Sequence, residues 1–136
     1  MSDEILVPVS PGELLDKITI LRIKATRMTE PKKLANVRRE LDALQATWRS
    51  HAYSRHDIGA EEAALQAVNE RLWVIEDDIR DKERDKSFDA EFVRLARAVY
   101  IENDERAAIK KRINERLGSS IVEEKSYRDY KGAPSG

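Results

Sequence analysis

Apolar residues recur at steps of three and four in four long segments of this chain, and this period constrains the fold more than any other feature. The stripes are, in chain order, Leu14, Ile18, Leu21, Ala25 and Met28; Leu34, Val37, Leu41, Leu44 and Trp48; Leu65, Val68, Leu72, Ile75 and Ile79; and Phe92, Leu95, Val99, Ile109, Ile113 and Leu117. Such spacing places apolar side chains on one face of an α-helix. Because only 5 Gly and 4 Pro are present in 136 residues, we predict an all-α fold.

The first helix has a complete start signal. Ser10 suits the N-cap, Pro11 the first helical position and Glu13 the third, as in a capping box. Further helices are predicted over about residues 31–50, 61–86 and 88–117, with Gly118 as the last stop signal. Short connections predict two antiparallel hairpins, and therefore a four-helix bundle.

The whole chain, residues 1–136, is predicted to form a single helical domain. Residues 1–9 form an extended N-terminal arm because Pro8 disfavours helix at the preceding residue. Residues 51–60 lack an apolar period and are predicted as a loop. Residues 118–136 form a C-terminal arm whose last residues are expected to be mobile.

The first helix is apolar on two sides, which predicts two neighbours. Ile20 and Ile23 lie away from its main stripe, and Asp16 lies near them. We expect the C-terminal arm or a second subunit to cover this patch, with Lys125 or Arg128 pairing with Asp16. The predicted interaction surface therefore consists of Asp16, Ile20, Ile23, Lys125 and Tyr127.

The stripe of the last helix is interrupted by polar residues. Asn103, Arg106 and Lys110 fall on its apolar face, and Asn69 and Glu76 flank the stripe of the facing helix. Two hypotheses follow. A fully paired polar layer would fix the helix register, since an unpaired buried polar group costs about 1–3 kcal/mol. Alternatively, Arg106 and Lys110 would hold an anion in a pocket, with Glu76 or Glu102 as acid or base.

The overall composition argues against several classes of protein. The 25 basic and 26 acidic residues give a net charge of -1, whereas nucleic-acid binders usually show a basic face. The chain has no Cys, and no apolar stretch approaches a membrane span. The paired loop histidines, His51 and His56, are too few for a metal site. We therefore predict no metal, no cofactor, no nucleic-acid partner and a cytoplasmic location.

Two enzyme classes remain open as alternatives. Carboxylates at Glu102 and Glu105 resemble half of the pattern of all-helical magnesium-dependent nucleotide pyrophosphohydrolases. Cations at Arg22, Arg106 and Lys110 would suit a dianion, as in helical chorismate mutases. No Gly-rich phosphate loop or nucleophile elbow is present.

Several segments resemble a family of small bacterial helical proteins known as a domain of unknown function. They are "VSPGELLDKITILRIK" (9–24), "KLANVRRELDAL" (33–44), "LQAVNERLWVIEDDIR" (65–80), "NDERAAIKKRIN" (103–114) and "GSSIVEEKSY" (118–127). The resemblance covers nearly the whole chain and implies a bacterial origin. It implies no reaction, but it emphasises polar positions at Glu13, Asp16, Lys17, Asn103, Glu105, Arg106, Glu124, Lys125 and Tyr127.

The favoured hypothesis is a non-enzymatic adaptor or assembly protein, acting as a homodimer or with a protein partner. The alternative is a small enzyme or a binder of an anionic metabolite that uses the polar layer of the second hairpin.

Overall fold

The computed structural model describes residues 3–130 and confirms the all-α prediction. Its helices are α1 (Pro11–Arg27), α2 (Pro31–Ser50), α3 (Gly59–Arg84) and α4 (Ala90–Leu117), with a short 3₁₀ helix, η1 (Ala52–Arg55), before α3. No strand occurs in this described range. The predicted mobility of the last residues concerns positions that lie outside it.

Local capping chemistry sets the start of α1 and both ends of α4. Ser10 Oγ accepts a hydrogen bond from the Glu13 amide at 3.1 Å, as the capping box predicts, and Gly118 ends α4 with a φ of 71°. The start of α4 is later than predicted, because the Asp89 side chain accepts from the Phe92 amide at 2.9 Å and so acts as the N-cap. The chain reverses just before this cap, at Lys86, whose φ is 54°.

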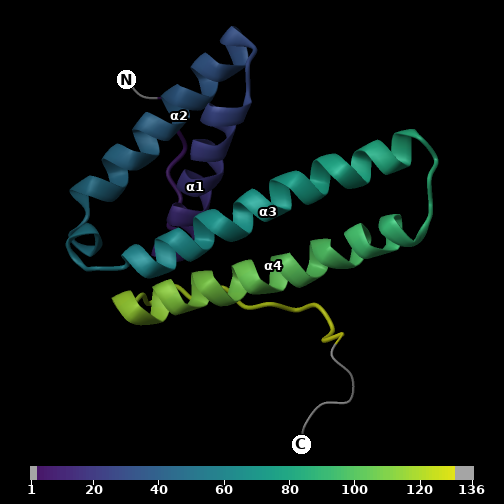
Figure 1. Ribbon diagram of the computed structural model, residues 1–136. Coiled ribbons are helices and arrows are strands. Elements are labelled where there is room, and N and C mark those ends of the chain that lie inside the picture. The colour runs from purple at the N-terminus through teal and green to yellow at the C-terminus, as the bar shows by residue number, and fades with distance from the viewer. Residues whose placement is uncertain (1–2, 131–136) are drawn as a thin grey trace, which may run out of the picture.

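The helices form two antiparallel hairpins, α1–α2 and α3–α4, as predicted (Figure 1). Helix α1 contacts the other three helices, whereas α2 packs mainly on α1. Figure 1 shows the α1–α2 hairpin lying across one end of the longer α3–α4 hairpin, whose other end projects beyond it. The C-terminal arm, residues 119–130 in the described part, returns along α4.

The core lies where the two hairpins cross. Its central residues are Leu15, Ile18, Ile58, Leu65, Val68, Ile109, Ile113 and Leu117. Leu15 is completely buried, while Leu14, which belongs to the predicted main stripe, is only partly buried. The two-sided apolar character of α1 is thus explained by neighbours on several sides within the same chain.

This arrangement corrects part of the predicted interaction surface. Ile23 is 1% exposed and Asp16 is 6% exposed, so both lie inside the chain rather than on a free surface. Ile20 is half-buried. The expectation failed because a helical wheel shows that a second face is apolar but does not show whether the same chain already covers it.

Helix α1 approaches α4 very closely at Gly12. A Cβ atom at this position would lie 2.6 Å from the Lys110 carbonyl oxygen and 2.9 Å from Asn114 Oδ1. The Gly12 amide uses the close approach to donate a hydrogen bond to Asn114 Oδ1 at 2.8 Å. The crossing of the two hairpins therefore requires a residue without a side chain here.

Gly12→Ala is expected to lower the free energy of unfolding by about 1–3 kcal/mol, because the added methyl group overlaps α4 backbone that cannot move freely. Urea denaturation measures the loss. The matched control is Gly59→Ala, whose Cβ would be no closer than 3.4 Å to its nearest neighbour. Equal stability of the two variants would contradict the close approach.

Candidate functional site

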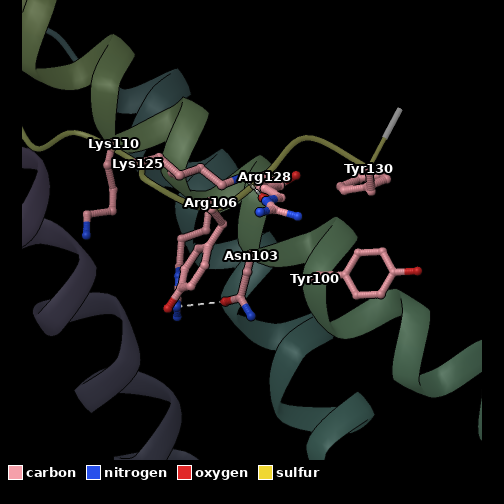
Figure 2. Close-up of a pocket in the computed structure, with 10 residues that line it drawn as sticks. Tyr100, Asn103, Arg106, Lys110, Lys125, Arg128 and Tyr130 are labelled. Carbon is pink, nitrogen blue, oxygen red and sulfur yellow. Dashed lines mark hydrogen bonds and ion pairs between the residues drawn. The ribbon is translucent and has the colours of Figure 1, made fainter. Parts of the chain in front are cut away.

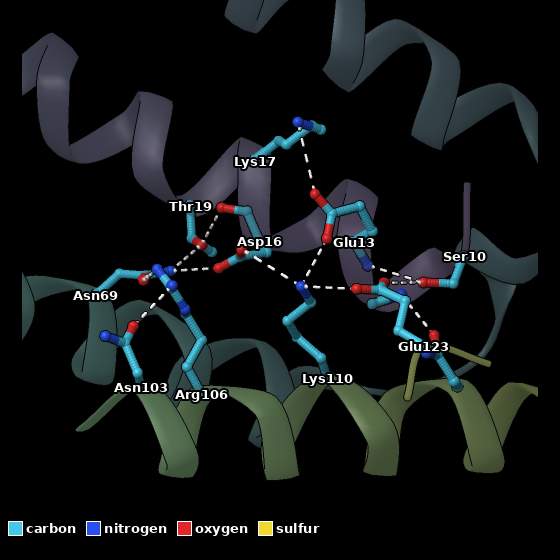
Figure 3. A network of polar contacts seen from close by, with 12 residues as sticks. Ser10, Glu13, Asp16, Lys17, Thr19, Asn69, Asn103, Arg106, Lys110 and Glu123 are labelled. Atoms are coloured by element: carbon cyan, nitrogen blue, oxygen red, sulfur yellow. Dashed lines mark hydrogen bonds and ion pairs between the residues drawn. The ribbon is translucent and has the colours of Figure 1, made fainter. Parts of the chain in front are cut away.

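Lys110 lies at the centre of a polar network that joins α1, α4 and the C-terminal arm (Figure 3). Its ammonium group lies 2.5 Å from Glu13 Oε2, 3.3 Å from Glu123 Oε2 and 3.8 Å from Asp16 Oδ2. The Lys110 side chain is only 16% exposed. A largely buried cation needs nearby negative charge to offset its lost hydration. Carboxylates of α1 and of the C-terminal arm supply this charge to Lys110.

Mutual attraction shifts the pKa values of this cluster. Burial acts to raise the pKa of Glu13, but the hydrogen bond and charge of Lys110 outweigh it, and the pKa falls below its ordinary value of 4.5. Burial likewise acts to lower the pKa of Lys110, but the Glu13 hydrogen bond and the surrounding carboxylates raise it above 10.5. Both shifts favour the charged forms in the folded protein.

Asp16 is paired on the side away from the C-terminal arm. The Asn69 amide nitrogen donates to Asp16 Oδ1 and to Thr19 Oγ1, each at 2.9 Å, and Thr19 Oγ1 donates to the Asp16 carbonyl at 2.9 Å. The predicted pairing of Asp16 with Lys125 or Arg128 is therefore wrong. Lys125 instead forms an ion pair with Asp104 of α4.

Arg106 lies next to Asn69 and Asn103, as the helical wheel predicted. Its Nη2 donates to Asn103 Oδ1 at 2.8 Å, and its Nη1 donates to Asn69 Oδ1 at 3.4 Å. Asn69 therefore links Asp16 of α1 to Arg106 of α4. Within residues 3–130, however, no carboxylate forms an ion pair with Arg106.

Glu76 does not join this group. Its carboxylate accepts a hydrogen bond from Arg80 at 3.3 Å on the same helix. Glu76 does line a smaller cleft of about 420 Å³ together with Asn69 and Arg106, but it bonds to neither of them there. Glu102 is also engaged, in an ion pair with Arg71 at 2.9 Å. The carboxylates considered as acid or base thus point to cations of α3 rather than to Arg106.

Two important residues of the network were missed from the sequence. Glu123 accepts a hydrogen bond from Ser10 Oγ at 3.0 Å and so ties the C-terminal arm to the start of α1. Asn114 anchors Gly12, as described above. Asn114 lies one turn after Lys110 on the same helix face, which is a usable signal, whereas nothing in the spacing of the arm indicates Glu123.

A cleft of about 680 Å³ opens between α4 and the C-terminal arm (Figure 2). We call it the arm cleft. Its polar and aromatic lining consists of Tyr100, Asn103, Asp104, Arg106 and Lys110 from α4, and Lys125, Tyr127, Arg128 and Tyr130 from the arm. Arg106 and Asn103 line both this cleft and the smaller one, and therefore stand between them.

The cations of the arm cleft differ in how they are neutralised. Lys125 forms an ion pair with Asp104, and Lys110 forms ion pairs with the carboxylates of its network. Arg106 and Arg128 form no ion pair with any residue between 3 and 130. The uncompensated positive charge of the cleft therefore belongs to these two arginines.

The comparisons with known proteins give a family but no activity. The model described as "Family of unknown function (DUF6165)" matches residues 5–136. The chain belongs to this family. No curated protein and no solved structure shows significant similarity to it.

The described residues of this DUF6165 chain form neither a cluster that could hold a metal ion nor a helix that could cross a membrane. Across residues 3–130, no group of three or more His, Cys, Asp or Glu side chains is arranged to hold a metal ion. His51 uses Nδ1 to accept from the Tyr53 amide at 3.1 Å, which caps η1. In the same range, no helix combines the length and apolarity needed to cross a bilayer.

Lys110→Met is expected to lower the free energy of unfolding by about 3 kcal/mol at neutral pH, since it leaves several partly buried carboxylates without their cation. Urea denaturation measures the change. Lys111→Met is the matched control, because Lys111 is exposed on the same helix. A loss that is the same in both variants would show that Lys110 does not hold the network.

The difference between wild type and Lys110→Met is expected to shrink in acid. Because the folded pKa of Glu13 is lowered, its pairing with Lys110 stabilises the protein above the ordinary value of 4.5 and is lost as the pH falls through the lowered pKa. Unfolding curves at about pH 7 and about pH 3 test this sign. A larger difference in acid would contradict it.

Proposed function

We propose that this protein binds a small anionic ligand in the arm cleft, with Arg106 as the principal anion-binding residue. The observation that carries the proposal is the half-buried guanidinium of Arg106, whose partners are the neutral oxygens of Asn69 and Asn103. Buried charges in proteins are normally paired. An external anion would supply the missing negative charge.

The two hypotheses for the polar layer are compatible in this arrangement. Asn69 and Asn103 hold the guanidinium in one orientation, which fixes the register between α3 and α4. The same contacts preorganise Arg106, so little side-chain freedom remains to be lost when a ligand binds. A guanidinium is also well suited to planar, paired hydrogen bonds with carboxylate or phosphate oxygens.

Lys110 has a structural role in this proposal. Its carboxylate neighbours already neutralise it, so an incoming anion would meet repulsion from them. Arg106 lies one turn away on the same helix, where those carboxylates are not its partners. Binding is favoured over catalysis because Glu76 and Glu102 are engaged with Arg80 and Arg71.

Arg106→Met is expected to weaken binding of the ligand by about 10- to 100-fold, the effect of losing charged hydrogen bonds. The free energy of unfolding is expected to fall by no more than about 3 kcal/mol, because the buried Asn69 Oδ1 loses its donor. Thermal-shift screening with inorganic phosphate, nucleotides and sugar nucleotides, followed by titration calorimetry, measures both properties. Arg112→Met, on an exposed position of the same helix, is the charge-matched control. A large loss of stability in Arg106→Met, with no shift by any anion in the wild type, would leave only the register role.

A second candidate function is self-assembly through the projecting end of the α3–α4 hairpin. Val93 and Ile101 are 53% and 41% exposed there. With Ala90 and Ala98 they form the apolar part of a shallow groove along α4, which Arg94, Arg97 and Glu102 also line. Two helices without further cover bury little apolar surface, which favours packing against another copy or a protein partner. This candidate agrees with the hypothesis of an adaptor protein in the bacterial cytoplasm, which the family resemblance implies. Its interaction surface would lie on α4 instead of α1.

Size-exclusion chromatography with light scattering is expected to show a dimer at high micromolar concentration. Val93→Asp combined with Ile101→Asp should give a folded monomer, because charges in the groove oppose its burial. Ile5→Asp, at an 89% exposed position of the N-terminal arm, is the control and should leave the dimer intact. A wild-type protein that stays monomeric throughout would remove this candidate.

A further inference from the structure

We propose that the ligand of the arm cleft is a nucleoside monophosphate, in which one sugar carries both a phosphate monoester and a planar base. This inference rests on the proposed anion site at Arg106 and goes beyond it by naming the chemical class of the ligand. The phosphate would lie against Arg106 and Arg128, and the ring against Tyr127.

The charge of the site matches a dianion. Of the cations that line the arm cleft, Lys125 and Lys110 are already neutralised by carboxylates of this chain. Arg106 and Arg128 remain, and neither forms an ion pair within residues 3–130, which gives two positive charges without a partner in that range. A phosphate monoester carries about -1.5 to -2 charges at neutral pH, whereas a single carboxylate carries one.

Hydrogen-bond donors remain available beside Arg106. Within residues 3–130 its guanidinium donates two hydrogen bonds, to Asn69 and Asn103, and it has further N–H groups beyond these. Asn103 accepts from Arg106 through Oδ1, and its amide nitrogen donates to no residue in the range 3–130. Several donors without protein acceptors suit the three terminal oxygens of a phosphate better than a carboxylate.

Tyr127 provides an aromatic surface that the fold itself does not use. Its side chain lines the arm cleft and is 85% exposed. Tyr100 and Tyr130, in contrast, contact each other with ring centroids 4.9 Å apart, at the end of the same cleft (Figure 2). Every nucleobase has a flat aromatic face, so any of them can stack on a tyrosine ring, whichever hydrogen-bonding groups it carries at its edge.

The size of the cleft also favours a ligand with two parts. Its volume of about 680 Å³ lies within the usual range for small-molecule sites and leaves ample room beyond one phosphate group. Because Arg106 belongs to α4 while Tyr127 and Arg128 belong to the arm, such a ligand would bridge the two segments. Binding is therefore expected to hold the arm against α4.

The test is titration calorimetry of the full chain with adenosine and uridine monophosphates, ribose 5-phosphate, inorganic phosphate and O-phosphotyrosine. A nucleotide is expected to bind about tenfold or more tightly than ribose 5-phosphate, the effect of one stacked base. Tyr127→Leu should remove this advantage without changing the affinity for ribose 5-phosphate, and Tyr127→Phe should retain it. Arg106→Met should weaken binding of both compounds.

A second readout uses trypsin, which cleaves after Lys125 and Arg128. Saturating nucleotide is expected to slow cleavage at these positions, and ribose 5-phosphate is expected to slow it less. Equal affinity for nucleotide and ribose 5-phosphate would overturn the inference and leave the anion site in place. Tighter binding of O-phosphotyrosine than of either nucleotide would overturn the nucleotide assignment, and no binding of any of these anions would overturn the anion site as well.

Discussion

The contact between the start of α1 and the last turns of α4 supports the rest of this structure. Gly12 brings the two backbones together, and Lys110, from the same stretch of α4, then meets Glu13 and Asp16. Glu123 reaches this cluster from the C-terminal arm. Because one ammonium group is shared by carboxylates from separate segments, the place of the arm depends on the same contact that sets the crossing of the hairpins.

The arm cleft is a consequence of that arrangement. Residues 119–130 bury little of their own surface, so a few specific contacts hold the arm along α4, among them the ring contact of Tyr130 with Tyr100. Its polar anchors are Glu123, which bonds to Lys110 and Ser10, and Lys125, which pairs with Asp104. Between these anchors and Arg106 the arm covers a space without filling it. The binding proposal depends on this space. It also depends on the contrast between Lys110, which has three carboxylate neighbours, and Arg106, which forms an ion pair with no carboxylate among residues 3–130.

Particular residues show how far the sequence could predict this site. The wheel of α4 placed Asn103, Arg106 and Lys110 on one face, and the structure brings the first two together with Asn69. That prediction needed only the helical period and an antiparallel partner. The partners of Asp16 were predicted wrongly because Asn69 and Lys110 belong to α3 and α4. Which of their residues lie beside Asp16 depends on how the two hairpins cross. Glu123 could not be found at all, since an irregular arm has no period from which to infer direction.

The sequence alone determined the local structure of this protein, because capping, helical period and chain reversal are properties of neighbouring residues. The start at Ser10, the stop at Gly118 and the pairing of helices into hairpins all follow from such short-range chemistry. Only the tertiary structure decided which face of α1 is covered by which helix, and which cations have carboxylate partners. The physical reason is that ion pairing acts over a few ångströms, so it depends on the relative height and rotation of packed helices, which no single helix encodes.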